Sequence, residues 1–375
     1  MKIAIIRKKY TFHGGAEGFS QKLISRLADA GNEVHIYAIQ WEGTPCSENI
    51  YFHKVPAITF NSVLRDLSFA ISSYVLLKRQ KFDIIQSHDK TLYQDIYRAG
   101  DGCHIEWLQQ RWKRAGFPRK LSIALNPYHW LILFIEKVLF NGRRFKKVIA
   151  ISELVKKNIL EHYHVNERDI EVIYNGVDLD RFHPANKTRY REEIRRRYSL
   201  ADDAFAVLFV GSGFERKGLE FLLRAAELIP EPLTILIAGK GSEKKYQQFI
   251  KKQRVIFCGP QKEIQKYYAA SDIFVFPAIY EPFGNVHLEA LASGLPVITT
   301  KLSGAAEIIK DGFHGFVMPL PEDYAAIAEK IQFLMDNSDA RQSMGLNARK
   351  RAEDFSFDRY SEKILKLYRD LASNV

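Results

Sequence analysis

Short apolar runs alternate with longer amphipathic stretches along the chain. The runs "KIAIIR" (2–7), "EVHIYAI" (33–39) and "FDIIQSH" (82–88) predict buried strands, and residues 14–31 predict a glycine turn followed by a helix. A strand, a helix and a second strand in this order indicate a βαβ unit. We therefore expect residues 1–175 to form a doubly wound α/β domain.

A second series of the same kind follows residue 175. It contains five apolar runs that predict strands with a helix between each and the next: "AFAVLFVG" (204–211), "LTILIAG" (233–239), "VIFCGP" (255–260), "DIFVFPA" (272–278) and "PVITT" (296–300). These runs predict a second parallel α/β domain over residues 176–356. In parallel α/β domains, ligands bind at loops that follow the strands, so candidate chemistry is sought there.

Composition supports a folded, two-domain protein. The chain has 375 residues, of which 46% are hydrophobic and 26% charged, and its three cysteines have neither metal-ligand nor disulfide-framework spacing. The first residues, "MKIAIIRKKY", enter a strand pattern without a signal-peptide core, which predicts a cytoplasmic location. Polar residues interrupt the apolar segment 121–140, so we expect no transmembrane helix there.

The positive charge of the chain calls for an acidic partner. Lysine and arginine exceed aspartate and glutamate by 55 to 44, a net charge of +11, which leaves nucleic acid, a phosphorylated ligand and an anionic membrane open. Residues 106–134 interleave aromatic side chains with cations, among them Lys113, Arg114, Arg119 and Lys120. This mixture predicts a membrane-docking and acceptor-binding segment. The alternative is an ordinary helix pair that buries its aromatic side chains.

Two glycine loops are candidates for binding an anion. Residues 13–19, "HGGAEGF", could offer backbone amides at a helix start, or could simply form a tight turn. They lack the G-x-G-x-x-G pattern of dinucleotide sites, which argues against a nicotinamide oxidoreductase. In "GSGFERKGLEFL" (211–222), Arg216 and Lys217 follow a glycine-lined strand end, which suits a diphosphate. The alternative is a solvated basic turn.

Two acids flank a predicted helix start in "EPFGNVHLEALASGLPVITT" (281–300). Glu281 is expected in the loop after a strand, and Glu289 is expected within the helix that begins near Asn285. Free amides at the helix start would lie between the two carboxylates, an arrangement that fits a sugar nucleotide. Taken separately, Glu281 could be a capping acid and Glu289 a surface acid.

Five segments together resemble the retaining, nucleotide-sugar-dependent glycosyltransferases of family 4. They are "GGAEGFSQKL" (14–23), "VIYNGVDLDRF" (172–182), "GSGFERKGLEFLL" (211–223), "AGKG" (238–241) and residues 281–300. Within that family, "YAIQWEG" (37–43) and "DGCHIEW" (101–107) are similar to glucosyltransferases that act on heptose of the lipopolysaccharide core. The resemblance implies the GT-B fold, in which two Rossmann-like domains face each other across a cleft. The first domain would bind the acceptor, the second would bind the nucleotide sugar, and the helix within 357–375 would return to the first.

The resemblance also implies roles for individual residues. Amides of Gly14 and Gly15 would contact the diphosphate, whose charge Arg216 and Lys217 would hold. Glu281 would bind sugar hydroxyls and Glu289 the ribose. The amides of Phe283, Gly284 and Asn285 would contact the donor. Asp101 lies where many relatives have a histidine that contacts the sugar, and His88 and His104 are the alternatives to Asp101.

These roles imply hexose transfer with retention of configuration and without a metal, since Arg216 and Lys217 can stabilise the leaving diphosphate electrostatically. UDP-glucose is the expected donor, and a lipid-linked saccharide such as the lipopolysaccharide core is the expected acceptor. The chain would associate peripherally with the anionic cytoplasmic face of the inner membrane, and nucleic acid is not an expected partner. The alternatives are another nucleotide sugar used for capsule, O-antigen or other surface glycan, and a non-catalytic basic binding module.

Overall fold

The computed structural model describes residues 1–10, 15–42 and 47–373. The chain forms two compact units, one from Met1–Tyr174 with Tyr360–Val375 and the other from Asn175–Arg359. The sequence predicts boundaries after residues 175 and 356, and the structure divides after 174 and 359. The ligand roles assigned to the two units stay predictions.

The first unit is built on a seven-stranded sheet of order β5-β3-β1-β6-β7-β8-β9, in which every recorded pairing is parallel. The central strands are almost wholly buried, which explains why their sequences are continuous apolar runs rather than alternating ones. The strands are β1 (Lys2–Ile6), β3 (Glu33–Ala38), β5 (Ile50–Lys54), β6 (Ile84–Ser87), β7 (Ile96–Ala99), β8 (Lys147–Ala150) and β9 (Ile170–Val172). A separate pair joins β2 (Lys9–Tyr10) and β4 (Gln40–Trp41).

Helices cover this sheet. Helix α2 (Ser62–Lys78) packs Phe69 and Leu77 into a cluster with Ala4, Tyr37 and Ile85. The C-terminal helix α13 (Phe357–Ala372) belongs to the first unit from Tyr360 onward and buries Ile364 and Tyr368. Helices α1 (Gly15–Asp29) and α6 (Glu153–His162) complete the layers, and Ser152 caps α6 by accepting a hydrogen bond from the Val155 amide at 3.1 Å.

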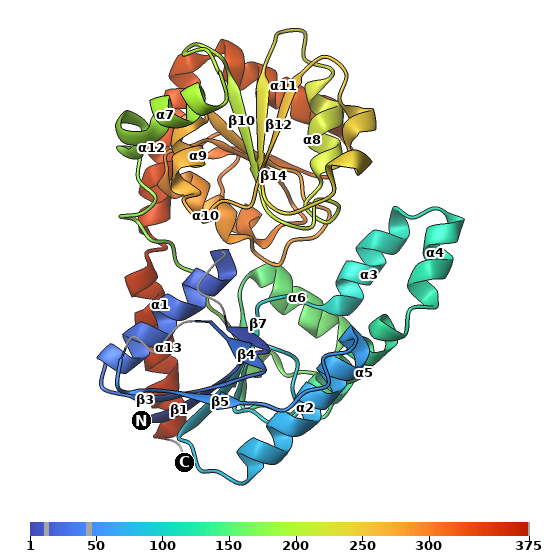
Figure 1. Ribbon diagram of the computed structural model, residues 1–375, viewed down its shortest axis with the longest axis vertical. Helices are drawn as coiled ribbons and strands as arrows, with labels where there is room; N and C mark the ends of the chain where they lie inside the picture. Colours follow the sequence, from blue (N-terminus) through green and yellow to red (C-terminus); the bar gives the residue numbers. More distant parts are fainter. Residues whose placement is uncertain (11–14, 43–46, 374–375) are drawn as a thin grey trace. The chain divides into compact units, whose positions relative to one another are not determined.

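Helices α3 (His104–Lys113), α4 (Phe117–Ala124) and α5 (Pro127–Asn141) form an arm, in which α3 and α4 project from the first unit and α5 packs beside α2 (Figure 1). Leu108, Ala115 and Ile123 give the arm a small core of its own. Among the described residues, no single helix is long and apolar enough to cross a membrane. The pair α4 and α5 meets that test only jointly, by length and composition, and is bent by 56°.

The second unit is built on a six-stranded parallel sheet of order β12-β11-β10-β13-β14-β15. Its strands are β10 (Ala206–Val210), β11 (Thr234–Ala238), β12 (Arg254–Gly259), β13 (Ile273–Phe276), β14 (Val297–Thr300) and β15 (Gly315–Met318). Its helices are α7 (Asn186–Arg197), α8 (Leu219–Ala226), α9 (Gln265–Ala270), α10 (Asn285–Ala292), α11 (Tyr324–Asp336) and α12 (Ser338–Glu353).

The helix predicted between β11 and β12 is not formed. Residues 239–253, all of them described, contain only the two short 3-10 turns Glu243–Lys245 and Gln247–Phe249. Tyr246, Phe249 and Ile250 are the large apolar side chains of this segment, too few to give a helix a buried face.

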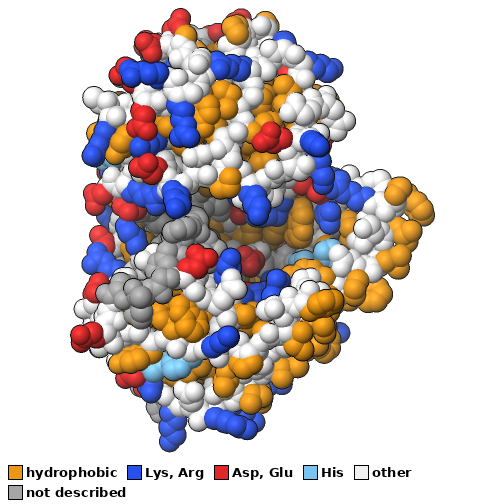
Figure 2. Space-filling model, viewed as in Figure 1, with side chains coloured by type: hydrophobic (Ala, Val, Ile, Leu, Met, Phe, Trp, Pro, Cys, Tyr) orange, Lys and Arg blue, Asp and Glu red, His pale blue; other side chains and the backbone are white. Residues whose placement is uncertain are grey.

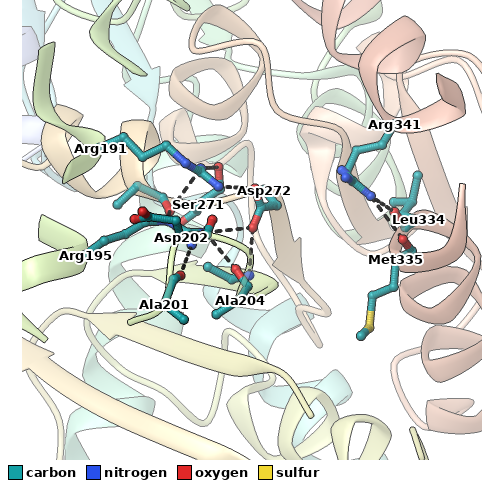
Figure 3. Close-up of polar contacts among 12 residues, drawn as sticks. Arg191, Arg195, Ala201, Asp202, Ala204, Ser271, Asp272, Leu334, Met335 and Arg341 are labelled. Carbon is teal, nitrogen blue, oxygen red and sulfur yellow. Dashed lines mark hydrogen bonds and ion pairs between the residues drawn. The ribbon is translucent and has the colours of Figure 1, made fainter. Parts of the chain in front are cut away.

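Helix α7, in the arginine-rich stretch, is fixed by a buried arginine (Figure 3). Arg195 is 2% exposed, and its guanidinium lies 3.1 Å from the carboxylate of Asp272. The guanidinium also donates to four main-chain carbonyls, those of Ala201, Asp202, Ala204 and Ala270, at 2.7–3.2 Å. Arg195 thereby ties α7 to the end of α9 and to the segment before β10.

Candidate active site

Strand order determines where the second unit can hold a ligand. The chain runs outward from β10 to β11 and β12, then returns to the other side of β10 to form β13. The loops after β10 and β13 therefore diverge from neighbouring strand ends, and a crevice of this kind is the usual ligand site of a doubly wound sheet. Arg216 and Lys217 lie in the first of these loops, and Glu281 lies in the second.

Gly211 and Lys217 show how closely the loop after β10 is packed. The Lys217 side chain folds against Gly211 so closely that a β-carbon at position 211 would overlap it. Lys217 also lies over the ring of Phe276, with its ammonium 5.3 Å from the ring centroid. The lysine is thus held near the sheet rather than extended into solvent, and its side chain is 13% exposed.

Glu281 is fixed by its main chain and paired through its side chain. Its amide donates to Leu302 at 2.9 Å, and its carbonyl accepts from Gly304 at 2.9 Å, so the main chain is pinned to the segment after β14. Its carboxylate lies 3.0 Å from Arg216 and 4.0 Å from Lys217. The three residues singled out on either side of the crevice therefore form one ionic group, in which Glu281 is buried and Arg216 and Lys217 are partly exposed.

Opposing effects set the protonation of this group. Burial by itself would raise the pKa of Glu281, but the charges of Arg216 and Lys217 hold that pKa below its ordinary value. Burial lowers the pKa of Lys217, and the nearby Glu281 carboxylate opposes this shift. Glu281 is consequently ionised at neutral pH.

Glu289 lies within α10 and is 8% exposed, so the reading of it as a surface acid is wrong. The Tyr268 hydroxyl donates to its carboxylate at 3.0 Å and also lies 3.1 Å from the carbonyl of Val286. Burial raises the pKa of Glu289, although the Tyr268 hydrogen bond opposes the rise. The charge of Lys217 lowers the pKa of both Glu281 and Glu289.

The start of α10 lies between these two acids along the chain. Phe283 is fully buried, and Gly284 has a φ of 83°, a left-handed conformation that favours glycine. Asn285 begins the helix, and its side-chain oxygen accepts from the Asn175 amide group at 2.6 Å. The first amides of a helix have no intrahelical acceptor, so this end can bind an anion.

The site residues predicted in the first unit have different surroundings and different partners. Asp101 is exposed in the turn after β7. His104 opens α3, where its amide donates to the Glu136 carboxylate at 2.7 Å and its ring lies 3.0 Å from that of His129. Burial, followed by the charge of Lys90, lowers the pKa of His104 to about 3. This histidine is therefore neutral at physiological pH.

His88, Gly14 and Gly15 complete the set predicted in the first unit. His88 follows β6 and lies 2.7 Å from the Gln86 side-chain amide, and burial lowers its pKa well below the ordinary value. Gly15 opens α1, whereas Gly14 lies outside the described residues. The anion-binding role expected of the two glycines stays a prediction.

Sequence reasoning missed an ion pair near Asp101. Lys90 follows β6 and lies 3.4 Å from Glu136, whose side chain is wholly buried and also accepts a 2.7 Å hydrogen bond from Tyr163. Asp101 contributes to the electrostatics of Lys90. The only signal in the sequence is a lysine directly after a predicted strand, which is too weak to identify the pair.

No group of three His, Cys, Asp or Glu side chains suited to a metal occurs in residues 1–10, 15–42 and 47–373. The sequence contains an Asp-x-Asp spacing at Asp178 and Asp180. The Asp178 carboxylate accepts main-chain hydrogen bonds from Asp180 at 3.2 Å and Arg181 at 3.1 Å, which makes it a turn-forming residue. Independence from metal stays a prediction.

The arm presents apolar side chains to solvent, and Figure 2 shows them gathered over α4 and α5. Phe117, Trp130 and Phe134 are 80%, 59% and 63% exposed. The alternative, an ordinary helix pair that buries its aromatic side chains, is therefore wrong for these three residues. Helix α2 adds an exposed stripe at helical spacing, made of Leu64, Leu67, Ile71 and Val75.

The four predicted cations of the arm differ in their surroundings. Lys113 and Arg119 are exposed. Lys120 lies over the ring of Trp112, 5.6 Å from its centroid. Arg114 is half-buried and donates to the Gln110 carbonyl at 3.0 Å, so it also caps the end of α3. Aromatic and cationic side chains thus share this surface.

Two family models together match most of the chain. One, described as "Glycosyltransferase Family 4", matches residues 13–181, and the other, "Glycosyl transferases group 1", matches residues 190–351. The first lies in the first unit apart from its last residues, and the second lies within the second unit.

Individual relatives cover nearly the full length. The chain is 26% identical to lipopolysaccharide glucosyltransferase WaaG of Escherichia coli K12, over 94% of each chain. It is 29% identical to an Escherichia coli UDP-Gal:alpha-D-GlcNAc-diphosphoundecaprenol alpha-1,3-galactosyltransferase, over 85% of this chain and 84% of that one. The crystal structure of WaaG superposes with a TM-score of 0.83 at 23% identity, over 98% and 99% of the two chains. Anabaena HepE, solved with UDP-glucose, superposes with a TM-score of 0.75 at 18% identity, over 99% and 100%.

Proposed function

Because this chain belongs to the family 4 glycosyltransferases of the GT-B fold, we propose that it transfers a hexose from a nucleotide sugar to a lipid-linked saccharide, with retention of configuration. The observation that carries the proposal is the ionic group of Arg216, Lys217 and Glu281 at the point where the strand order of the second unit reverses. A merely solvated basic turn would not pair both cations with an acid from the loop after a neighbouring strand. A diphosphate needs cations of this kind.

The chemistry assigned to this group is electrostatic. As the acceptor hydroxyl oxygen bonds to the anomeric carbon, the bond from that carbon to the diphosphate oxygen breaks, and the hydroxyl proton passes to a phosphate oxygen on the same face. Arg216 and Lys217 stabilise the charge that develops on the leaving diphosphate. No protein nucleophile takes part in this sequence of events.

The two glutamates bind the two ends of the donor in this proposal. Glu281, ionised and fixed by its main chain, accepts hydrogen bonds from sugar hydroxyls. Glu289 accepts hydrogen bonds from ribose hydroxyls, and the amides of Phe283, Gly284 and Asn285 contact the diphosphate or the sugar. In the first unit, Asp101 contacts the sugar. His104 and His88 are the alternatives, and both are held neutral by burial.

UDP-glucose is the proposed donor, and the lipopolysaccharide core is the proposed acceptor. The WaaG relative, a lipopolysaccharide glucosyltransferase, supports glucose as the sugar and lipopolysaccharide as the acceptor. The galactosyltransferase relative supports the alternative of another nucleotide sugar used for a different surface glycan. A non-catalytic binding module is less favoured, because it would not need Arg216, Lys217, Glu281 and Glu289 together.

The arm is the proposed contact with an anionic membrane, at the cytoplasmic face of the inner membrane. Its exposed aromatic side chains suit the headgroup region, and its cations suit anionic lipid. The apolar stripe on α2 extends this surface within the first unit. Peripheral attachment of this kind would bring the enzyme to a lipid-linked acceptor.

A panel of UDP-, GDP- and ADP-sugars tests the proposal with the purified protein. Thermal stabilisation should select UDP-glucose, and transfer to lipopolysaccharide core acceptor should be abolished by Lys217→Ala or Glu281→Ala in folded protein. Wild-type turnover in either variant would contradict the site assignment. Activity that disappears with a chelator and returns with Mg²⁺ would contradict the metal-free mechanism.

A further inference from the structure

His287 is a buried histidine that none of the roles above uses. It occupies the first turn of α10 and has no exposed surface. The rings of Phe276 and Phe274 meet it edge-on, with centroids 4.8 Å and 5.7 Å away. The apolar surroundings leave its two ring nitrogens with specific polar partners, and these partners define what the side chain does.

The two partners fix the tautomer of the ring. Nδ1 lies 2.9 Å from the Gly284 carbonyl, and Nε2 lies 2.8 Å from the Thr299 hydroxyl. A carbonyl can only accept, so a neutral ring must carry its single proton on Nδ1 and donate it to Gly284. Nε2 and the carbonyl of Phe276 then share the single proton of the Thr299 hydroxyl, which lies 2.8 Å from the ring nitrogen and 3.0 Å from the carbonyl oxygen. Burial lowers the pKa of His287 to about 4, which is consistent with a neutral ring.

The Gly284 carbonyl also accepts a hydrogen bond from the main-chain amide of His287, at 3.0 Å. Two donors on one residue therefore hold this carbonyl. In a planar trans peptide, the carbonyl of one residue and the N–H of the next point in opposite directions. Fixing the carbonyl of Gly284 toward His287 thus directs the N–H of Asn285 away from it, at the open end of the helix.

We propose that His287 is a positioning residue, which holds the Gly284–Asn285 peptide so that the Asn285 N–H faces the diphosphate of the nucleotide-sugar donor. The inference rests on the proposed function and deepens it. Gly284 needs such support because its φ of 83° is one of several conformations open to glycine. Thr299 connects the histidine to two inner strands, because it lies in β14 and its hydroxyl is 3.0 Å from the carbonyl of Phe276 in β13.

Two substitutions separate the two ring nitrogens. In His287→Asn the side-chain amide can occupy the place of Nδ1 and still donate to Gly284, whereas in His287→Gln it reaches toward Thr299 instead. Loss of one well-directed hydrogen bond changes affinity up to about tenfold. We expect the KM for UDP-glucose to rise about tenfold in His287→Gln and to stay within about threefold of wild type in His287→Asn.

Thr299→Val is the matched control. It removes the Nε2 partner but leaves the Nδ1 bond to Gly284, so we expect a lower melting temperature with little change in the KM for UDP-glucose. A residue that only fills the core would show the opposite pattern, with changes in KM following changes in melting temperature in all three variants. That result would overturn the inference.

Hydrogen–deuterium exchange measures how firmly the main chain of this loop is held, and it needs no nucleotide sugar. Amides in residues 281–287 should exchange faster in His287→Gln than in His287→Asn, and equal exchange in the two variants would overturn the inference. The proposed function fails in a different way, namely if wild-type protein binds and turns over no nucleotide sugar. The exchange measurement decides the role of His287 in either case.

Discussion

The guanidinium of Arg216 lies 3.0 Å from the carboxylate of Glu281, and the two residues follow neighbouring strands of one sheet. Because both loops start from the strand ends β10 and β13, the pairing follows directly from strand order. Lys217 joins the pair from the same loop as Arg216, with its ammonium 4.0 Å from Glu281. The Glu281 carboxylate is therefore paired with the two cations that the proposed function assigns to the diphosphate.

Lys217 is the first residue to test. Lys217→Ala should lower kcat by about 10²–10³, the loss expected when one preorganised donor to a developing charge is removed. Steady-state rates with UDP-glucose measure the effect. Lys350→Ala, which removes an exposed lysine of the same unit, should leave kcat unchanged. Equal rates in the two variants would mean that Lys217 does not act on the leaving group.

Glu289→Gln should weaken binding of the donor and raise the melting temperature. Burial raises the pKa of Glu289 above the ordinary value of 4.5, so its ionised form is disfavoured in the folded protein. A group whose pKa is higher in the folded state contributes stability below its unfolded pKa, and that contribution is lost as the pH rises through the folded pKa. Glutamine does not ionise and avoids the loss.

The variant should accordingly melt at a higher temperature than wild type near neutral pH, with the gap closing as the pH falls below about 4.5. Its KM for UDP-glucose should rise about 10–100-fold, since a hydrogen bond to a charged acceptor is lost. Thermal melts across this pH range and donor titrations measure both effects. Glu329→Gln, at a side chain that is 71% exposed, is the control for an acid away from the site. A melting difference that does not depend on pH would contradict this account.

Arg195 should be essential for the stability of the second unit. Arg195→Met would remove one of the two arginines paired with Asp272, leaving Arg191, and would remove the donor to four main-chain carbonyls. Breaking a buried ion pair from one side is expected to destabilise the protein by about 3–5 kcal/mol. Arg196→Ala, in a pair whose side chains are each 77% exposed, should change stability by less than about 1 kcal/mol. Urea denaturation compares the two, and similar midpoints would contradict the structural role of Arg195.

The sequence predicts most of the inner strands because parallel strands covered on both faces are continuous apolar runs. It does not predict β5, β9 or β15. It predicts the β11–β12 connection wrongly, since regular alternation of strands and helices does not reveal that residues 239–253 lack enough apolar positions for a helix. It also gives no indication that Arg195, in a stretch of arginines, is buried while its neighbour Arg196 is exposed.

Some residues of the candidate site can likewise be predicted from the sequence, and others cannot. Arg216, Lys217, Glu281 and Glu289 are identifiable from glycine loops, helix starts and family resemblance, and the structure brings the first three into contact. His287 and Tyr268 are not identifiable in this way, because each acts through another residue and lies in an apolar stretch typical of a core. A histidine three positions after a helix-start glycine, as in "GNVH" (284–287), is the signal that could have drawn attention to His287.

The arm should bind anionic vesicles through two separable contributions. The first is charge, tested by replacing Lys113, Arg114, Arg119 and Lys120 with glutamine. This change should remove about 1 kcal/mol of binding free energy per cation, and the loss should be smaller at high salt because the attraction is screened. Phe117→Ser with Trp130→Ser should instead weaken binding at both low and high salt, since apolar burial is not screened. Vesicles of phosphatidylglycerol and phosphatidylcholine in a sedimentation assay measure both effects. Glutamine at four exposed lysines of the second unit, Lys244, Lys245, Lys251 and Lys252, is the charge-matched control. If this control weakens binding as much as the arm variant does, net charge rather than the arm governs attachment.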